Sequence, residues 1–365
     1  MIPFNQLKPL HDYLADEINA ALLRVAVSGW YILGPEVAAF EREFAAYHGV
    51  RHAVGVATGT DAIELALRAG EVGKGDEVIT VAHTALATVA AIEATGAAPV
   101  LADIDSETFT LCPDAARAAI TRRTRAIVAV HLYGGAADMD SLRALAQKHD
   151  LLLIEDCAQA HGALYRGRKL GTLGSLGAFS FYPTKNMGAY GDGGAVITND
   201  DALADKLRKL RNYGQSSRYR HQSRGTNSRL DEMQAAVLRV KLAHLDDLNQ
   251  RRRDIAAIYE ANLTGVRKPG VRADCQHVYH LYVIRDARRD QLMADLQERG
   301  IGSLIHYPVP VHLQESHRDL GLGAGSLPHT ERAAREILSL PLYIGLRDDA
   351  ALRVCEAVGH LRGAL

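Results

Sequence analysis

The middle of the chain alternates short apolar or β-branched runs with Ala- and Leu-rich segments, and this alternation constrains the fold most strongly. We expect the runs to be strands over 53–57, 78–81, 99–104, 125–132, 151–155, 178–182 and 195–198. Helices are expected between them, over 61–69, 84–95, 113–120, 138–149 and 200–212. Alternating strands and helices build a sheet of mostly parallel strands, which helices cover on both faces. The sequence therefore predicts an α/β fold with a large, mainly parallel sheet.

A second pattern follows this alternation. Leu230, Met233, Val237 and Leu248 keep close to the 3.6-residue spacing of a helix, so one long amphipathic helix is predicted to bridge two domains. Beyond it we expect a strand over 277–284, a helix over 288–299, a short strand ending near 306 and a terminal helix from about 347. A chain of 365 residues is long enough for two domains. We expect a large domain over 1–245, with an N-terminal helical segment, and a smaller α+β domain over 246–365.

Composition and charge exclude several classes of protein. The 42 Lys and Arg residues balance 43 Asp and Glu residues, so nothing global draws the chain to nucleic acid or to an anionic membrane. No run approaches the ~20 apolar residues of a membrane span, and the N-terminus lacks the basic start and apolar run of a secretory signal. The four cysteines lie far apart without C-x-x-C spacing. We therefore expect a cytoplasmic protein without a metal site.

Three motifs place reactive groups at the ends of predicted strands. Gly59 and Thr60 stand where a strand ends and a helix begins, so their backbone N–H groups can hold a phosphate. Asp156 ends an apolar strand, and a carboxylate there can keep a pyridine nitrogen protonated. Lys185 follows another such strand, where desolvation would make its amine a nucleophile. Singly, these could be a capped turn, a solvated acid and a surface lysine; their order along one chain favours a coenzyme site.

In this order the motifs resemble the fold-type I pyridoxal-phosphate enzymes, and more narrowly the sugar aminotransferases named after DegT, DnrJ, EryC1 and StrS. The similarity covers nearly all of the chain and includes GVATGTDAIELAL, VHLYGGAADMD, IEDCAQAHGA, GAFSFYPTKNMGAYGDGGAVITND and NSRLDEMQAAVL. It implies a pyridoxal 5′-phosphate-dependent aminotransferase that moves an amino group from L-glutamate to a nucleotide-linked keto sugar. No metal is implied.

The resemblance also implies roles for single residues around the coenzyme ring. Lys185 would form the covalent imine with the coenzyme and, once released, would carry protons between coenzyme and substrate. Asp156 would pair with the pyridine nitrogen, and Gln159 would contact the ring or its 3′ oxygen.

Further residues are implied at the phosphate. Gly59, Thr60 and Ser180 would hold it from one subunit, and Asn227 would reach it from the neighbouring subunit. The resemblance therefore implies a homodimer with shared active sites. Arg229 would be a candidate for anionic groups of the substrate.

One stretch departs from the family pattern. Relatives commonly place an aromatic side chain over the coenzyme ring just after the second strand, where this chain has Ala85 and Val89. His83 is the nearest candidate to replace that stack. A histidine beside a helix start can equally be a cap or a surface residue.

Other details favour one substrate class by resemblance alone. VHLYGGAADMD, YPTKNMGAYGDGG and IHYPVPVHLQ are similar to enzymes that aminate C3 of a 3-keto-6-deoxyhexose, with dTDP as the expected nucleotide, whereas the C4 branch more often carries GEGG. The candidates for the sugar side are Tyr182, His306, Tyr307 and His312. Arg218, Arg220 and Arg224 could hold the diphosphate or could form a solvated face.

Other functions fit the sequence less well. A nicotinamide oxidoreductase would carry G-x-G-x-x-G after a strand, and this chain has no such run. A non-catalytic regulatory protein could share the fold, but it would have no use for an imine-forming lysine. A sugar dehydratase of this family would be expected to carry histidine in place of Lys185.

Overall fold

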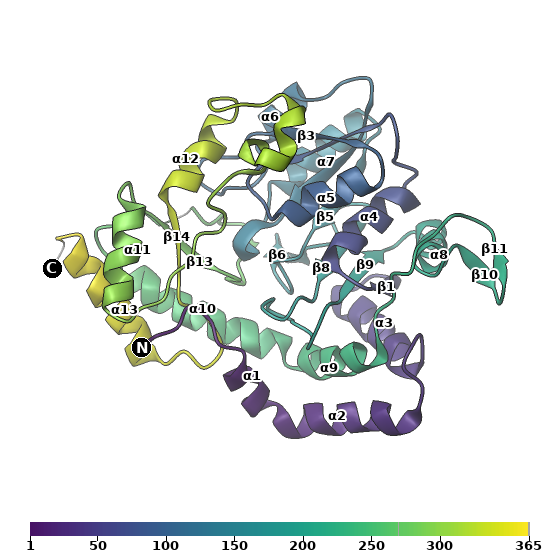
Figure 1. Ribbon diagram of the computed structural model, residues 1–365, viewed down its shortest axis with the longest axis horizontal. Coiled ribbons are helices and arrows are strands. Elements are labelled where there is room, and N and C mark those ends of the chain that lie inside the picture. The colour runs from purple at the N-terminus through teal and green to yellow at the C-terminus, as the bar shows by residue number, and fades with distance from the viewer. Residues whose placement is uncertain (269, 364–365) are drawn as a thin grey trace.

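The computed structural model describes residues 1–268 and 270–363, and a seven-stranded sheet forms its centre (Figure 1). The strand order is β1-β9-β8-β5-β4-β2-β3, and only β9 runs antiparallel to its neighbours. The strands are β1 (His52–Val56), β2 (Glu77–Val81), β3 (Ala98–Ala102), β4 (Thr124–Val130), β5 (Leu152–Asp156), β8 (Leu176–Ser180) and β9 (Gly194–Thr198). The predicted α/β fold with a mainly parallel sheet is confirmed.

Helices cover both faces of this sheet. One face packs against α3 (Pro35–His48), α6 (Pro113–Ala118) and α7 (Met139–Lys148), and the other against α4 (Gly59–Ala69), α5 (Leu86–Ala94) and α8 (Asp201–Leu210). Ile127 and Val128, successive residues of β4, belong to opposite apolar clusters because successive side chains of a strand point to opposite faces. Burial on both faces explains why these strands are apolar without alternation.

The predicted long helix is wrong in one respect: it is two helices. α9 (Glu232–Ala243) and α10 (Leu245–Asn262) meet at His244, whose φ of −105° and ψ of 1° are not helical. Asp246 and Asp247 lie in the first turn of α10, where the positive end of a helix favours acidic side chains. A one-residue interruption hardly disturbs the apolar spacing, so the sequence pattern runs through the break. α9 packs against α2 (Ala15–Ser28) and α3, whereas α10 runs to the C-terminal part of the chain (Figure 1).

The C-terminal part is a small α+β unit around its own apolar cluster. β13 (Tyr282–Arg285) pairs antiparallel with β14 (Ile337–Leu340), and α11 (Arg289–Glu298), α12 (Pro328–Glu336) and α13 (Asp348–Leu361) surround them. The strand predicted from 277 begins only at Tyr282, and the strand predicted before His306 is reduced to a single bridge between Leu304 and Ser339. The domain boundary at residue 245 stays a prediction, and residues 364–365 lie outside the described part of the chain.

Short elements complete the described chain. They are α1 (Lys8–Tyr13), the strands β6 (Leu164–Tyr165), β7 (Arg168–Lys169), β10 (Gln215–Ser217), β11 (Arg220–His221) and β12 (Cys275–Gln276), and the 3-10 helices at Leu132–Gly134, Val311–Leu313 and Glu315–Leu320. In residues 1–268 and 270–363, no helix combines the length and the apolar character needed to cross a membrane.

Candidate active site

A cavity of about 270 Å³ opens where β4, β5 and β8 end and where α4 begins. Because parallel strands end at the same edge of a sheet, side chains far apart in sequence meet there. The cavity brings together seven of the residues that we predicted from the sequence, namely Gly59, Thr60, Asp156, Gln159, Ser180, Tyr182 and Lys185. Thr84, Ala85, Thr88, His131 and Asp192 also line it.

The start of α4 forms one end of this cavity. The Thr58 hydroxyl accepts a hydrogen bond from the Asp61 backbone N–H (3.0 Å) and caps the helix. The first N–H groups of a helix have no partner within the helix, so those of Gly59 and Thr60 are suited to an anion. Gly59 packs so closely on Ser180 that a Cβ at position 59 would overlap the serine side chain. Glycine is therefore required for the helix start and Ser180 to face one ligand together.

Neutral groups hold the carboxylate of Asp156, which is only 5% exposed. Its Oδ2 accepts a hydrogen bond from the Thr88 hydroxyl (2.9 Å) and its Oδ1 accepts one from the Ala158 N–H (3.1 Å). Thr84 in turn lies 2.9 Å from Thr88, hydroxyl to hydroxyl. A buried carboxylate held by uncharged donors can still pair with a cation, so Asp156 fits a protonated pyridine nitrogen. The sequence analysis missed Thr88, whose only signal was its place near the start of the helix predicted over 84–95.

Lys185 lies in the loop between β8 and β9, and its amine reaches the same cavity. Desolvation lowers the pKa of Lys185 to about 8, and the negative charge of Asp156 partly opposes this shift. A large fraction of the amine is therefore neutral in mildly alkaline solution, and a neutral amine can attack a carbonyl carbon.

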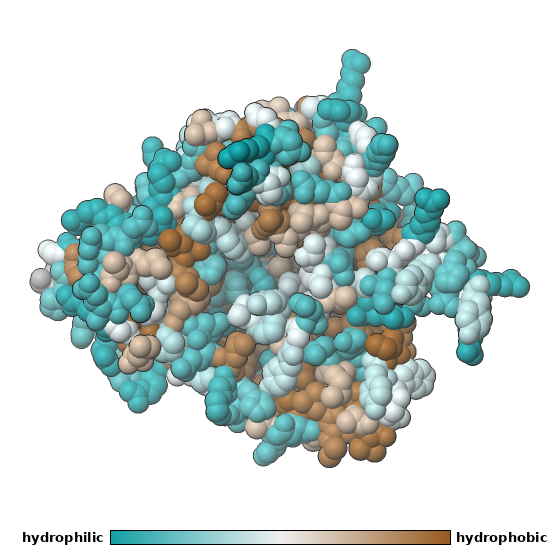
Figure 2. Space-filling view, viewed as in Figure 1, coloured by the Kyte–Doolittle hydropathy of each residue, from teal (hydrophilic) through white to brown (hydrophobic). Residues whose placement is uncertain are grey.

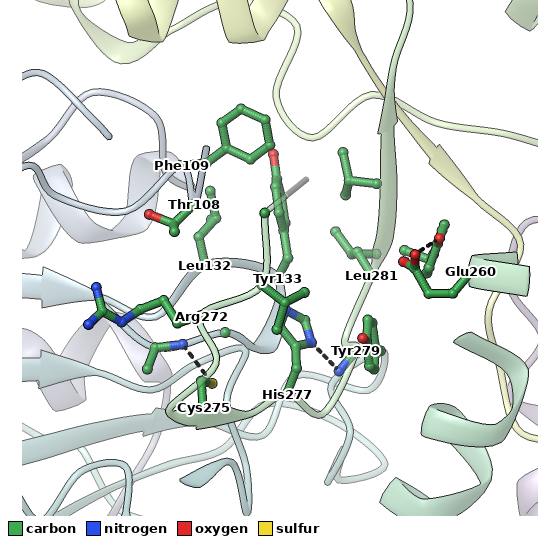
Figure 3. Close-up of a pocket in the computed structure, with 16 residues that line it drawn as sticks. Thr108, Phe109, Leu132, Tyr133, Glu260, Arg272, Cys275, His277, Tyr279 and Leu281 are labelled. Carbon is green, nitrogen blue, oxygen red and sulfur yellow. Dashed lines mark hydrogen bonds between the residues drawn. The ribbon is translucent and has the colours of Figure 1, made fainter. Parts of the chain in front are cut away.

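Hydrogen bonds from two directions orient Gln159. Its Oε1 accepts from the backbone N–H of Tyr133 (2.7 Å), and its Nε2 donates to the Tyr307 hydroxyl (3.2 Å). Tyr133 has a left-handed backbone with φ of 60°, and its hydroxyl donates to the backbone carbonyl of His306. Tyr133 also lines a second, smaller cavity of about 40 Å³, together with Phe109 and other residues (Figure 3). Through Gln159, Tyr133 thus connects the wall of the second cavity to the cavity of about 270 Å³. The sequence did not reveal this role.

His83 does not replace the missing aromatic stack, which corrects our prediction. Its Nε2 lies 2.9 Å from the Tyr133 hydroxyl, its ring packs edge-on against Phe109, and it does not line the cavity that holds Asp156 and Lys185. Burial lowers the pKa of His83 to about 4, so the ring is neutral. Ala85 does line the cavity, whereas Val89 is fully buried in a separate apolar cluster. No aromatic ring of residues 82–89 therefore lines this cavity.

His312 also differs from its predicted place. It is 1% exposed, its Nε2 lies 3.3 Å from Glu331, and it does not line the cavity that holds Asp156 and Lys185. The apolar residues around it pack the 311–327 segment onto the large sheet, and this packing turns the histidine inward. Tyr307 borders the cavity through Gln159, and the ring of His306 bonds to the Ser339 hydroxyl (2.9 Å).

Asn227 and Arg229 do not line the cavity of their own chain. Asn227 is exposed, and Arg229 donates a hydrogen bond to the side chain of Asn212 (3.2 Å). The β10–β11 hairpin, with Arg218 and Arg220, stands off from the body of the molecule at the right edge of Figure 1.

Glu155, the neighbour of Asp156, connects His131 in the cavity wall to the 171–174 segment. It has no exposed surface and accepts hydrogen bonds from His131 Nε2 (2.9 Å) and from the backbone N–H groups of Gly171 (2.8 Å), Leu173 (2.6 Å) and Gly174 (2.6 Å). His131, Glu155 and Cys157 come close enough together to suggest a metal site, but hydrogen bonds already occupy both Glu155 oxygens.

We expect Glu155→Ala to lower the free energy of unfolding by about 3–5 kcal/mol, because it leaves four donors, three of them buried, without an acceptor. Urea unfolding of the purified protein measures this loss. Glu298→Ala, at an exposed position, should change the free energy by less than about 0.5 kcal/mol. A loss below about 1 kcal/mol for Glu155→Ala would contradict the assigned role.

The sheet, the helix start that faces Ser180, the buried Asp156 and the desolvated Lys185 together define a pyridoxal-phosphate-dependent aminotransferase of fold type I. The model of the DegT/DnrJ/EryC1/StrS aminotransferase family matches residues 12–359, and the chain belongs to this family. The resemblance found in the sequence is confirmed.

Individual relatives agree with this assignment. The dTDP-3-amino-3,4,6-trideoxy-alpha-D-glucose transaminase of Streptomyces venezuelae is 52% identical over 360 residues, which are 98% of this chain and 95% of the relative. The erythromycin biosynthesis sensory transduction protein EryC1 of Saccharopolyspora erythraea is 50% identical, over 96% of each chain. The crystal structure of S. venezuelae DesV in complex with a ketimine intermediate superposes with a TM-score of 0.98, at 51% identity, and covers 100% of this chain and 99% of DesV.

Proposed function

We propose that this protein transfers an amino group from L-glutamate to the C3 keto group of a dTDP-linked 3-keto-6-deoxyhexose. The observation that carries the proposal is the convergence of Lys185, Asp156 and the start of α4 on one cavity. The S. venezuelae relative, named for a 3-amino sugar, supports C3 over C4 as the carbon that is aminated. The S. erythraea relative has a regulatory name, but a regulatory scaffold would not need the desolvated amine of Lys185.

Some residues of the cavity bind the coenzyme, and Lys185 transfers protons. Pyridoxal phosphate, when bound, supplies the electron sink that stabilises a carbanion beside the transferred nitrogen. The start of α4 and Ser180 hold its phosphate, and Asp156 keeps the ring nitrogen protonated. The amine of Lys185, neutral for a large fraction of molecules near pH 8, accepts a proton from one carbon and returns it to another.

The absorption spectrum of the protein with pyridoxal phosphate, before and after L-glutamate, tests the first half of this reaction. We expect a visible band that moves to shorter wavelength when glutamate is added. The protein is then offered dTDP-linked 3-keto and 4-keto 6-deoxyhexoses, and NMR identifies the carbon that carries the new amine. A band that does not respond to glutamate would contradict the donor, and faster turnover of the 4-keto sugar would contradict the carbon.

We propose further that the protein works as a homodimer with shared active sites. Exposed apolar side chains gather on α2 and the loop after it, where Leu23, Val27, Trp30, Tyr31 and Ile32 lie (Figure 2). A contiguous apolar patch of this kind marks a protein interface. In such a dimer Asn227 would reach the partner's coenzyme phosphate, and Arg218, Arg220 and Arg224 would meet the diphosphate of the substrate.

Mixed dimers test whether the sites are shared. Asn227→Ala should weaken coenzyme binding, and Lys185→Ala should remove turnover. A dimer of one chain of each variant regains one intact site if Asn227 acts on the partner's coenzyme. Random mixing should therefore restore about a quarter of the wild-type activity at limiting coenzyme. Mixing without any recovery would contradict shared sites.

A further inference from the structure

A chain of buried amides lies directly behind Lys185. Asn186, the next residue, is 3% exposed. Its Nδ2 donates to Asn249 Oδ1 (2.9 Å) and to the backbone carbonyl of Val278 (3.0 Å), and its Oδ1 lies 3.2 Å from His280 Nδ1. Both hydrogens of the amide nitrogen are thus engaged, which fixes the orientation of the side chain.

The chain continues through Asn249 on α10, which is 1% exposed. The Nδ2 of Asn249 donates to the backbone carbonyl of His161 (2.8 Å). Gly162 leaves the space for this contact, because a Cβ there would lie 2.9 Å from Asn249 Nδ2. Asn249 and Asn186 therefore join three separate parts of the protein, namely the segment after β5, the helix α10 and the segment before β13.

The loop that carries Lys185 depends on such contacts because it has no strand or helix of its own between β8 and β9. Within the loop the Lys185 N–H donates to the Tyr182 carbonyl (2.8 Å). On its far side Lys241 of α9 donates to the Gly188 carbonyl (2.5 Å), and the Gln234 side chain accepts from the Tyr190 N–H (2.8 Å). The amide chain is the contact at the residue adjacent to the lysine, so it has the most direct effect on where the lysine side chain begins.

The chemistry of the amides also suits this place. A buried amide costs free energy unless it is hydrogen-bonded, whereas a leucine of similar volume at position 186 or 249 would carry no such cost. A carboxylate behind Lys185 would favour the protonated amine. Amides supply directional hydrogen bonds without charge.

We propose that Asn249 is a positioning residue for Lys185, which acts through Asn186 to fix the backbone from which the lysine reaches the cavity. The inference rests on the proposed role of Lys185 as the reacting amine. Misplacement of a reacting group by about 1 Å can slow a reaction by about 100-fold. The structure therefore assigns to α10 a part in catalysis, although none of its side chains lines the coenzyme cavity.

The test compares Asn249→Leu with a matched control on the same helix. Asn262 is exposed and bonds to a carbonyl of its own helix (Ile258, 2.8 Å), so Asn262→Leu makes the same chemical change without touching the loop. We expect Asn249→Leu to lower kcat by about 10- to 100-fold and to change KM for L-glutamate by less than about threefold. Asn262→Leu should leave both unchanged.

A second readout does not depend on activity. In the coenzyme-free protein, amide hydrogen exchange over residues 183–190 should be at least about tenfold faster in Asn249→Leu than in wild type. Exchange in the control variant should match wild type. If Asn249→Leu does not fold, Asn249→Ala replaces it, because it removes the same two side-chain hydrogen bonds without adding bulk or charge.

The double variant Asn186→Leu, Asn249→Leu then tests whether the two residues act as one unit. Its loss of kcat should be no greater than that of the more damaging single variant. Unchanged exchange together with unchanged kcat in Asn249→Leu would overturn the proposal. A loss of kcat in the double variant equal to the product of the two single-variant losses would also overturn it. Transamination by Lys185→Ala would instead refute the proposed function, and the exchange result would still report on the loop.

Discussion

Lys185→Ala is expected to abolish transamination and to leave the fold intact. Loss of a residue that bonds to the reacting group slows other enzymes by roughly 10⁴-fold or more, and we expect a loss of that size here. Lys185 lines the cavity and belongs to none of the apolar clusters of the core, so its removal should leave the fold intact. The amount of 2-oxoglutarate formed from L-glutamate measures the activity, and circular dichroism measures the fold.

Lys148→Ala, at an exposed position on α7, is the matched control and should retain full activity. The visible band of the coenzyme gives a second check, because without the amine of Lys185 the protein should bind pyridoxal phosphate only by noncovalent contacts. Transamination that survives in Lys185→Ala would exclude Lys185 as the reacting amine.

Asp156→Asn is expected to lower kcat/KM by about 10³-fold, because an amide of the same size cannot hold the ring nitrogen in its protonated form. Stopped-flow absorbance of the half-reaction with L-glutamate measures this loss. Thr88→Val provides a graded comparison: it removes one hydrogen bond to the carboxylate and keeps the charge, so a loss of about tenfold is expected. If Asp156→Asn lost no more activity than Thr88→Val, the charge of Asp156 would not be what the reaction needs.

Much of the fold could be predicted because its strands are buried on both faces. Apolar runs without alternation located all seven strands of the large sheet to within a few residues, and the polar residues at their ends marked the cavity. Gly59, Asp156 and Lys185 were accessible to sequence reasoning because the carboxyl edge of a parallel sheet collects such groups whatever the details of packing.

The remaining features depend on contacts between distant segments. Thr88 meets Asp156 only because β2, β4 and β5 are neighbours in the sheet, and no local pattern encodes that order. His83 and His312 were predicted to face ligands, but packing against Phe109 and Glu331 turns both inward. The break between α9 and α10 at His244 could not be predicted, because the apolar residues keep their helical spacing across it.

The desolvated amine of Lys185 has a consequence for how the chain can evolve. A buried ammonium group destabilises a folded protein, and the depressed pKa of Lys185 shows that its charged form is disfavoured there. Many side chains without charge would suit the same place better, and natural selection readily discards a residue that only destabilises. A lineage released from catalysis would therefore drift away from lysine at this position.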